Sequence, residues 1–279
     1  MRKTTRGTPV TILTYLVVGV AAVLFLAPFY FMLRAALMTG TQVTDPDWHW
    51  LPAPFTLQGF TDLFDDPSVP MASALRNSFV IAIVTAPVST LLGSMAGYAL
   101  ARISVPGRGV VMSFIVVTLM IPTSATFVPT FVLVSAMGGV DTLWGVMVPG
   151  LFNAFSVLLF RNFYLKFPQE IEEAGRLDGL GHLGVYWRLA LPNSGALLAS
   201  LGTLSFIESW NAFLWPLVIG QDPESWTAQI ALSTFLTSQS INLPALFAGA
   251  VVTILPLVVV FLFAQRYIVQ GIAATGVKD

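Results

Sequence analysis

Long stretches without a charged side chain constrain this sequence more than any other feature. They cover residues 7–33, 77–101, 109–140, 142–160 and 225–265, and a further stretch, 189–221, is interrupted only by Glu208. A charged side chain near the middle of a bilayer costs roughly 2.5–3.5 kcal/mol, and a helix needs about 20 apolar residues to cross it. Charged residues make up only 10% of the chain, against about 25% in soluble domains. The sequence therefore predicts an all-α integral membrane protein and excludes a soluble enzyme.

Six transmembrane helices fit these stretches. Their predicted bounds are 11–33, 77–101, 110–134, 142–160, 195–219 and 244–265. Residues 225–242 are too polar to cross a bilayer, so the last helix is predicted to begin only at Pro244. Membrane β-strands would alternate apolar and polar residues, whereas these stretches are apolar on all sides. Proline is expected to kink most of the helices, at Pro28, Pro87, Pro122, Pro129, Pro149, Pro216 and Pro256.

Lysine and arginine are unevenly distributed between the segments that connect these helices. Eleven of the thirteen lie in segments that the six-helix pattern places on one side: Arg2, Lys3, Arg6, Arg102, Arg108, Arg161, Lys166, Arg176, Arg188, Arg266 and Lys278. Because positive residues mark the cytoplasmic side, we expect a cytoplasmic N-terminus (1–10), an external loop (34–76) and a cytoplasmic C-terminal tail (266–279). The first helix is longer than the apolar core of a signal peptide, so we expect it to remain as the first span.

The longest predicted cytoplasmic segment, residues 161–192, contains signals for two helices. Pro168 suits the first position of a helix, and the acidic residues that follow it complement the helix dipole. Asp178-Gly179 predicts that this helix ends in a tight turn, with the glycine at positive φ. A second helix is predicted over about 181–190, ended by Leu191-Pro192. Its apolar side either binds a partner or rests on lipid headgroups, and consists of Leu183, Tyr186, Trp187 and Ala190.

The same segment resembles the EAA motif of ABC importer permeases. The residues that carry this resemblance are Glu173, Ala174, Gly175, Asp178, Gly179, Leu191 and Pro192. Two further stretches, 210–216 and 265–271, are similar to the carbohydrate branch of that family, the maltose and glycerol-phosphate type. The resemblance covers essentially the whole chain, although Gly175, Ala196 and Ala212 replace residues that are usual in the family.

The resemblance implies a transport subunit and not an enzyme. Residues 77–265 would form the core of a six-helix permease, of the binding-protein-dependent transport system inner membrane component type, and 161–192 would couple it to an ATPase. The implied partners are a second homologous permease, two ATPase subunits at the cytoplasmic face, an external solute-binding protein and the lipid bilayer, but no nucleic acid. ATP and Mg²⁺ would be bound by the ATPase subunits, with no cofactor in this chain. Consistently, Lys3, Lys166 and Lys278 lack the preceding glycine that a phosphate-binding loop requires.

Glu208 is the only ionisable residue well inside a predicted helix, which marks it as a functional candidate. In a continuous helix, Glu208, Asn211 and Trp215 align at spacings of three and four. We expect these three to face the translocation path or the partner permease, and Trp210 to pack within its own bundle. Aromatic rings beside hydrogen-bonding groups suit a sugar. The alternative is that Glu208 and Asn211 only form hydrogen bonds between helices.

Two other classes of protein are alternatives. A secondary transporter driven by an ion gradient would show inverted repeats and charged residues at corresponding positions of two halves, but no repeat is apparent and only Glu208 is available. A membrane enzyme would need a catalytic motif, and none is found. His49 and His182 are predicted on opposite sides of the membrane, so they cannot form a metal site together. The resemblance therefore favours an ABC importer permease for a sugar or related polyhydroxylated solute.

Overall fold

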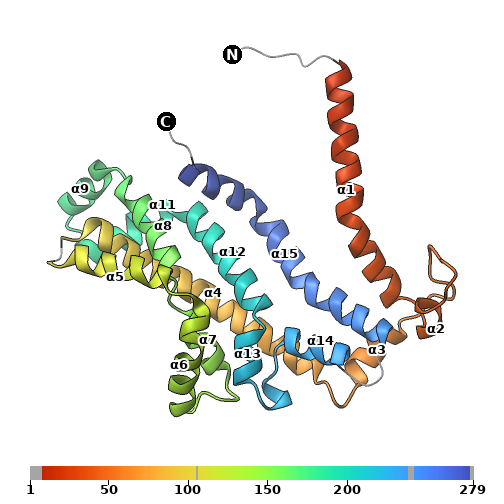
Figure 1. Ribbon diagram of the computed structural model, residues 1–279. Helices are drawn as coiled ribbons and strands as arrows, with labels where there is room; N and C mark the ends of the chain where they lie inside the picture. The colour runs from red at the N-terminus through yellow and green to blue at the C-terminus, as the bar shows by residue number, and fades with distance from the viewer. Residues whose placement is uncertain (1–7, 105, 238–241, 277–279) are drawn as a thin grey trace. The chain divides into compact units, whose positions relative to one another are not determined.

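The computed structural model describes residues 8–104, 106–237 and 242–276, and every regular element within these ranges is helical. In chain order (Figure 1), the elements are α1 (Thr8–Ala36), α2 (Gly40–Val43), α3 (Gln58–Asp65), α4 (Met71–Arg102), α5 (Arg108–Met120), α6 (Thr123–Ala136), α7 (Leu143–Met147), η1 (Val148–Gly150), α8 (Ala154–Leu165), α9 (Gln169–Leu177), α10 (His182–Val185), η2 (Tyr186–Ala190), α11 (Leu191–Asn193), α12 (Gly195–Asn211), α13 (Leu214–Ile219), η3 (Pro223–Ser225), α14 (Ala228–Thr237) and α15 (Leu243–Gly276). The all-α prediction is confirmed for this part of the chain. The predicted cytoplasmic ends lie outside it at 1–7 and 277–279.

Three helical stretches among the described residues are long and apolar enough to cross a membrane by themselves: Thr11–Ala36, Met71–Arg102 and Leu243–Tyr267. Three further candidates are bent pairs, with angles of 103° between α5 and α6, 43° between α7–η1 and α8, and 79° between α10–α11 and α12. The number of spans is therefore six if each bent pair counts as one. The single helices predicted over 110–134, 142–160 and 195–219 are wrong in detail, because each is broken.

Proline explains two of these breaks. Ile121 precedes Pro122 and has ψ 119°, in keeping with the steric exclusion of the α conformation before proline. Pro216 has no N–H for the carbonyl of Ala212, and its ring would collide with that carbonyl in a helix. Ala212 accordingly adopts ψ 128°, and α12 ends at Asn211. Kinks were predicted at both prolines, but the backbone leaves the helix altogether. Other prolines remain inside helices, at Pro28, Pro87, Pro129 and Pro256.

The described residues divide into two compact units. The first contains residues up to Val69 together with 232–254, and the second contains 70–231 together with the residues from Leu255 onward. In the first unit, the aromatic rings of Phe31, Trp48 and Trp50 form successive edge-to-face contacts. The guanidinium of Arg34 lies 4.1 Å from the centre of the Trp48 ring, a cation–π contact. All of the candidate functional residues belong to the second unit.

In the second unit, α4 packs against both α8 and α12. Its contact with α8 is close because Gly97 has no side chain. A Cβ at Gly97 would lie 2.6 Å from Cβ of Phe160 and 2.8 Å from the backbone nitrogen of Arg161. Small residues allow membrane helices to approach in this way. Buried aromatic and aliphatic residues of α4, α8 and α12 form the core beside this crossing, among them Tyr98, Phe160, Tyr164, Leu197 and Leu201.

Candidate functional sites

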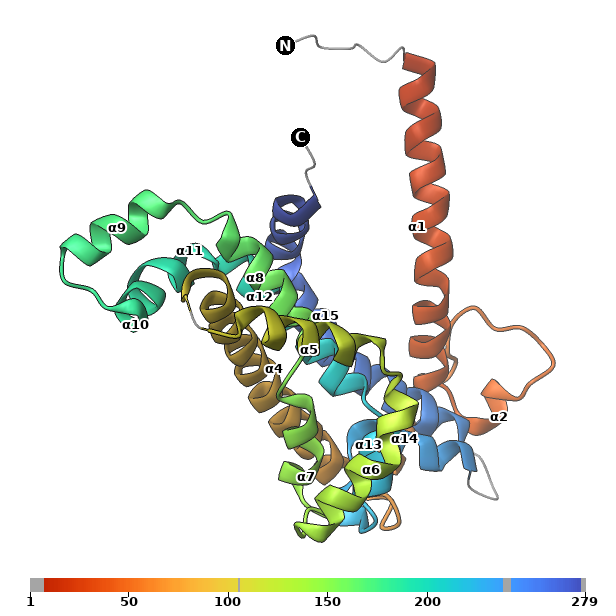
Figure 2. The ribbon, with the colours of Figure 1, turned by 60° about the vertical axis from the view of Figure 1, so that its left-hand side comes forward.

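The segment 161–192 contains the end of α8, the helix α9 and a sharp turn, as predicted (Figure 2). The N–H groups of Asp178, Gly179 and Leu180 bond back to carbonyls of α9 at 2.9–3.0 Å, which closes the helix end. Gly179 has φ +83°, a conformation that side chains other than hydrogen strongly disfavour. The prediction of a glycine-dependent turn at Asp178-Gly179 is confirmed.

The second predicted helix, over 181–190, is wrong at its end. α10, the π-helical turn η2 and α11 follow one another directly and continue to Asn193. Leu191-Pro192 therefore does not stop the helix. Pro192 lies in the first turn of α11, where the absence of an N–H costs least. The π-turn shifts the hydrogen-bond register just before this proline, because the N–H of Leu191 bonds to the carbonyl of Tyr186.

A buried ion pair attaches α9 to the end of α4. Nε of Arg102 lies 3.2 Å from a carboxylate oxygen of Glu172, and the two side chains are only 8% and 6% exposed. The same Nε donates to the carbonyl of Tyr164 at 2.8 Å, and a terminal nitrogen of Arg102 donates to the carbonyl of Phe167. One guanidinium thus holds the end of α8 and the first half of α9 together. In the sequence, Arg102 is recognisable only as one of the positive residues that mark the cytoplasmic side, and this contact is not predicted.

A cluster of three tyrosines (Tyr98, Tyr164 and Tyr186) lies beside the ion pair. The hydroxyl of Tyr164 is 2.8 Å from the hydroxyl of Ser94 and 3.0 Å from that of Ser194, and Tyr186 donates to Ser94 at 3.1 Å. The Tyr98 ring lies 5.3 and 5.2 Å from the rings of the other two. Residues of α4, α8, η2 and the start of α12 are therefore joined by buried hydrogen bonds and ring contacts.

The exposed side of the segment carries most of the residues of the predicted motif. Glu173, Ala174, Asp178 and Gly179 are exposed, as is Pro192, while Gly175 is buried and Leu191 half-buried. A Cβ at Gly175 would lie 2.6 Å from Cδ1 of Leu189, so that leucine fills the space an alanine would need. The predicted apolar side of the second helix is divided. Tyr186 and Ala190 are buried, whereas Leu183 is 68% exposed and Trp187 46%.

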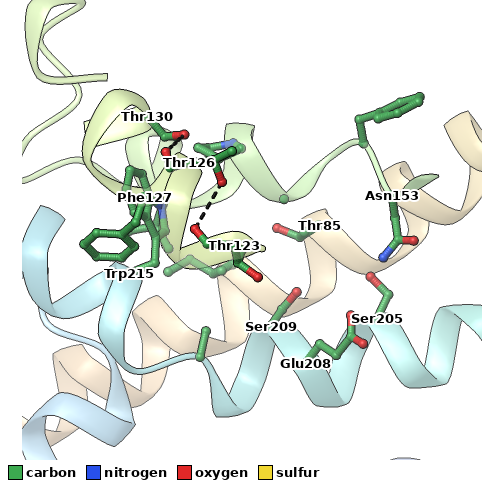
Figure 3. A pocket seen from close by; sticks show the side chains of 16 residues that line it. Thr85, Thr123, Thr126, Phe127, Thr130, Asn153, Ser205, Glu208, Ser209 and Trp215 are labelled. Carbon is green, nitrogen blue, oxygen red and sulfur yellow. Dashed lines mark hydrogen bonds between the residues drawn. The ribbon is translucent and has the colours of Figure 1, made fainter. Parts of the chain in front are cut away.

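A second candidate site is a cavity of about 380 Å³ in the same unit (Figure 3). Residues of α4, α6, α7, η1, α12 and α13 line it, so each of the broken stretches α5–α6, α7–α8 and α12–α13 contributes to its wall. Its polar lining consists of Thr85, Thr123, Thr126, Thr130, Asn153, Ser205, Glu208 and Ser209, and its aromatic lining of Phe127, Phe152 and Trp215. Non-helical backbone at membrane depth is tolerated where it lines such a cavity.

The side chains around the cavity differ in how they are bonded. Nε1 of Trp215 donates to the carbonyl of Gly145 at 3.2 Å, and its ring meets that of Phe127 edge to face at 5.7 Å. Figure 3 shows both rings on one side of the opening, with Thr85 and Ser209 beside it. The hydroxyl of Thr85 is buried and has no hydrogen-bond partner among the described residues. Its place in the cavity leaves it available to a bound molecule.

The cavity contains two of the three residues predicted to share a row. Glu208 and Trp215 line it, but Asn211 does not. Its Oδ1 instead accepts a hydrogen bond of 3.4 Å from Nε2 of Gln229. The row assumed a continuous helix, but α12 ends at Asn211, so the spacing of α12 does not determine where Trp215 of α13 points. Trp210 does pack inside its own bundle as predicted, 1% exposed and stacked on Phe206.

The hydroxyl groups of the cavity were not predicted from the sequence. Thr123, Thr126 and Thr130 follow Pro122 at spacings of three and four, which places them on one side of α6. That polar stripe in an apolar stretch was a readable signal. Thr85 and Asn153 gave no such signal in the sequence. Single polar residues in membrane helices commonly bond to their own backbone, as Thr130 does to the carbonyl of Thr126 at 2.7 Å.

Comparisons with known proteins agree with these observations. The family described as "Binding-protein-dependent transport system inner membrane component" matches residues 89–274. The arabinooligosaccharides transport system permease protein AraQ of Halalkalibacterium halodurans is 36% identical over 227 residues, 81% of each chain. The sn-glycerol-3-phosphate transport system permease protein UgpE of Yersinia enterocolitica is 30% identical over 273 residues, 96% of each chain. A bacterial ABC transporter involved in the import of the acidic polysaccharide alginate has a chain of the same fold, with a TM-score of 0.83 at 23% identity, covering 96% of this chain and 99% of that one.

Proposed function

Because the chain belongs to the binding-protein-dependent transport system inner membrane component family, the permeases of ABC importers, we propose that it is a transmembrane subunit of an ATP-driven importer for a sugar or related polyhydroxylated solute. Two relatives are named for the transport of arabinooligosaccharides and of sn-glycerol-3-phosphate, and both names support a polyhydroxylated solute. Neither supports a secondary transporter driven by an ion gradient. The proposed partners are a second permease, two ATPase subunits and an external solute-binding protein.

The observation that carries the proposal is that the coupling segment (residues 161–192) has some of its side chains exposed and others buried against its own helices. Glu173, Ala174 and Asp178 are exposed around a turn that Gly179 fixes. Glu172, between them and the core, is buried and ion-paired to Arg102. Such an element presents a defined surface to another protein while being held firmly to its own helices. A loop that only rested on lipid headgroups would need no buried charge pair, since that pair costs desolvation energy.

In the proposed mechanism, ATP binding closes the two ATPase subunits and displaces the coupling segment. Arg102 and the tyrosine cluster make α4 and α8 move together with α9. The cavity then opens alternately to the two sides of the membrane, and the binding protein delivers solute to the outer side. Glu208 and Trp215 contact the solute on its path. In this mechanism the partner subunits hydrolyse ATP, and this chain transmits the movement and forms part of the solute path.

Gly179→Val tests the coupling role. A β-branched residue at φ +83° is strained, so the turn is expected to change shape while the protein remains in the membrane. In proteoliposomes that contain the assembled transporter, we expect solute-stimulated ATP hydrolysis and uptake to be lost together. Gly181→Val is the matched control, because Gly181 is also exposed but has φ −73° and open space around it. Unchanged stimulation and uptake in Gly179→Val would remove this segment from the mechanism.

The proposed orientation places both termini in the cytoplasm. It rests on the eleven-to-two asymmetry of lysine and arginine. A reporter that is active only outside the cell should work when fused at about residue 60 or 230 and fail at 175 or 279. Activity of the reporter at 175 would contradict both the orientation and the coupling role.

A further inference from the structure

The cavity contains one charge and nothing to neutralise it. Of the sixteen residues that line it in the described structure, Glu208 alone is ionisable, and no lysine, arginine or histidine is among them. Glu208 is exposed to the cavity and forms no ion pair with another described residue. An anionic solute in this space would therefore meet a carboxylate and no cation.

The nearest arginines on α4 are too distant to change this balance. Thr85, the cavity residue of α4, is nine residues from Arg76 and seventeen from Arg102. Helical rise separates these positions by about 14 Å and about 26 Å. Arg102 is moreover already paired with Glu172. Among the residues that line the cavity, the charge is therefore that of Glu208 alone.

The cavity also lies deep within the helices that form it. Thr85 is the fifteenth of the 32 residues of α4, which puts it close to the middle of a helix long enough to cross the membrane. Charges interact more strongly there than in bulk water. For two unit charges about 7 Å apart, Coulomb's law gives a discrimination of about 3-fold at the dielectric constant of water and about 50-fold at the effective value of a protein surface.

The remaining lining suits a neutral polyhydroxylated ring. The Thr85 hydroxyl lacks a partner within the described structure. The Oδ1 of Asn153 caps α8 through the N–H of Ser156 at 2.9 Å, so its amide nitrogen is the group left for a ligand. The rings of Phe127 and Trp215 supply apolar faces. These groups can bond to sugar hydroxyls and pack against a sugar ring, but none of them compensates a negative charge.

We propose that this cavity admits uncharged sugars and excludes acidic ones, with Glu208 as the residue that determines this specificity. The inference rests on the proposed function, because it takes the cavity as part of the translocation path. It identifies the solute as a neutral saccharide, and it separates such a solute from sugar phosphates and from saccharides that contain uronic acids. Removal of the carboxylate should therefore relax the exclusion while the hydrogen bonds to neutral sugars persist.

The test compares uptake of paired probes into proteoliposomes that contain the complete transporter and its binding protein. The probes are malto-, cello- and galactotriose, each against the same trisaccharide with one terminal primary hydroxyl oxidised to a carboxylate. Because the binding protein is the same for every variant, a change in the ratio of acidic to neutral uptake comes from the permease. Glu208→Gln keeps the size of the side chain and should raise this ratio by about 3- to 50-fold. Glu224→Gln, which removes an exposed carboxylate outside the cavity, should leave the ratio unchanged.

The outcomes distinguish a failure of the role of Glu208 from a failure of the proposed function. An unchanged ratio in Glu208→Gln, or equal uptake of both probes by the wild type, would overturn the role of Glu208. If no saccharide, neutral or acidic, is taken up with ATP, the proposed function itself fails. If Glu208→Gln does not assemble, the test is the binding of the probes to the wild-type complex in lipid nanodiscs, without the binding protein. Calorimetric binding of an oxidised trisaccharide as tight as that of its neutral counterpart would then refute the proposal.

Thr85→Val tests whether the solute uses the cavity at all. Valine has nearly the volume of threonine but no hydroxyl, so we expect the KM for neutral trisaccharides to rise by about tenfold, the lower part of the range for a lost hydrogen bond. Thr227→Val is the matched control, since its hydroxyl is equally buried and also without a partner in the described structure, but lies outside the cavity. An unchanged KM in Thr85→Val, or equal changes in the two variants, would remove the cavity from the path.

Discussion

Two polar side chains of α4, Arg102 and Thr85, are bonded in opposite ways. At the end of the helix, Arg102 is buried, ion-paired to Glu172 and hydrogen-bonded to the carbonyls of Tyr164 and Phe167, although the hydroxyl of Tyr98 one turn earlier has no partner in the described structure. Near its middle, Thr85 is equally buried but has no partner in the described structure, and it shares a cavity with the unpaired Glu208. A region that transmits movement must keep its shape, whereas a region that binds a solute must leave groups free. The comparison indicates a rigid end and a receptive middle in one helix.

The largest expected effect is on the rigid end. Arg102→Met removes the buried partner of Glu172 and leaves only the half-exposed Arg176, whose terminal nitrogen lies 3.9 Å from the carboxylate. Loss of one partner of a buried pair typically costs about 3–5 kcal/mol. We expect a large fall in the yield of assembled complex and in its thermal unfolding temperature. The double variant Arg102→Met/Glu172→Met should recover much of this loss, because it also removes the buried carboxylate of Glu172. Thr85→Val, in the middle of the same helix, should leave both quantities unchanged, and equal losses at the two positions would contradict the comparison.

The next largest effect concerns the close crossing of α4 and α8. Gly97→Ala places a methyl group 2.6 Å from Cβ of Phe160 and 2.8 Å from a backbone nitrogen, neither of which can move easily. Overpacking of this kind costs about 1–3 kcal/mol, so the complex should unfold at a lower temperature. Gly202→Ala in α12 is the control, because its new methyl group would meet only Thr90, at 3.6 Å. If both variants unfold at the wild-type temperature, the crossing is not rigid.

The rigid end and the cavity also differ in how far the sequence predicts them. The charge-free stretches predicted an all-helical membrane protein, and Asp178-Gly179 predicted the turn after α9. Both predictions succeeded because each signal lies within a short piece of sequence. The pairing of Arg102 with Glu172 could not be read, since it joins residues that only the tertiary fold brings together. The cavity depends on where helices break. Proline stays inside the helix at Pro87 and ends it before Pro216, and packing of neighbouring helices, which the sequence does not reveal, decides between these outcomes.

A smaller effect is expected at Asp141, which holds the helix that carries Trp215. The N–H of Asp141 bonds to the carbonyl of Ile219 at 2.9 Å, and its carboxylate accepts N–H bonds from Gln221 and Asp222 at 2.6 and 2.7 Å. The N–H of Asp222 is the main cause that lowers the pKa of the Asp141 carboxyl below its ordinary value. A lowered pKa stabilises the folded form above the ordinary value, and the stabilisation is lost as the pH falls through the lowered pKa.

Amide hydrogen exchange at residues 220–225 checks this contact. Protection should be constant near neutral pH, begin to fall below the ordinary carboxyl value of about 4, and be lost as the pH drops through the lowered pKa, where the carboxylate is protonated. Asp141→Asn tolerates the left-handed backbone, with φ 57° at this position, but it removes the charge. The variant should show modestly lower protection without the acid-dependent fall. Because the group is exposed, an effect that remains in high salt would point to the geometry of the turn and not to the charge.

The smallest effect is expected at Asn211, and it sharpens the boundary of the cavity. The sequence grouped this residue with Glu208 and Trp215, but in the structure it lies outside the cavity lining and forms a hydrogen bond of 3.4 Å with Gln229. Asn211→Leu should therefore leave the ratio of acidic to neutral uptake as in the wild type. It should lower the yield of assembled complex only slightly, in keeping with about 0.6 kcal/mol for an average hydrogen bond between membrane helices. A change in sugar preference as large as that of Glu208→Gln would instead extend the receptive region to the end of α12, and it would show that the residues facing the solute do not coincide with those lining this cavity.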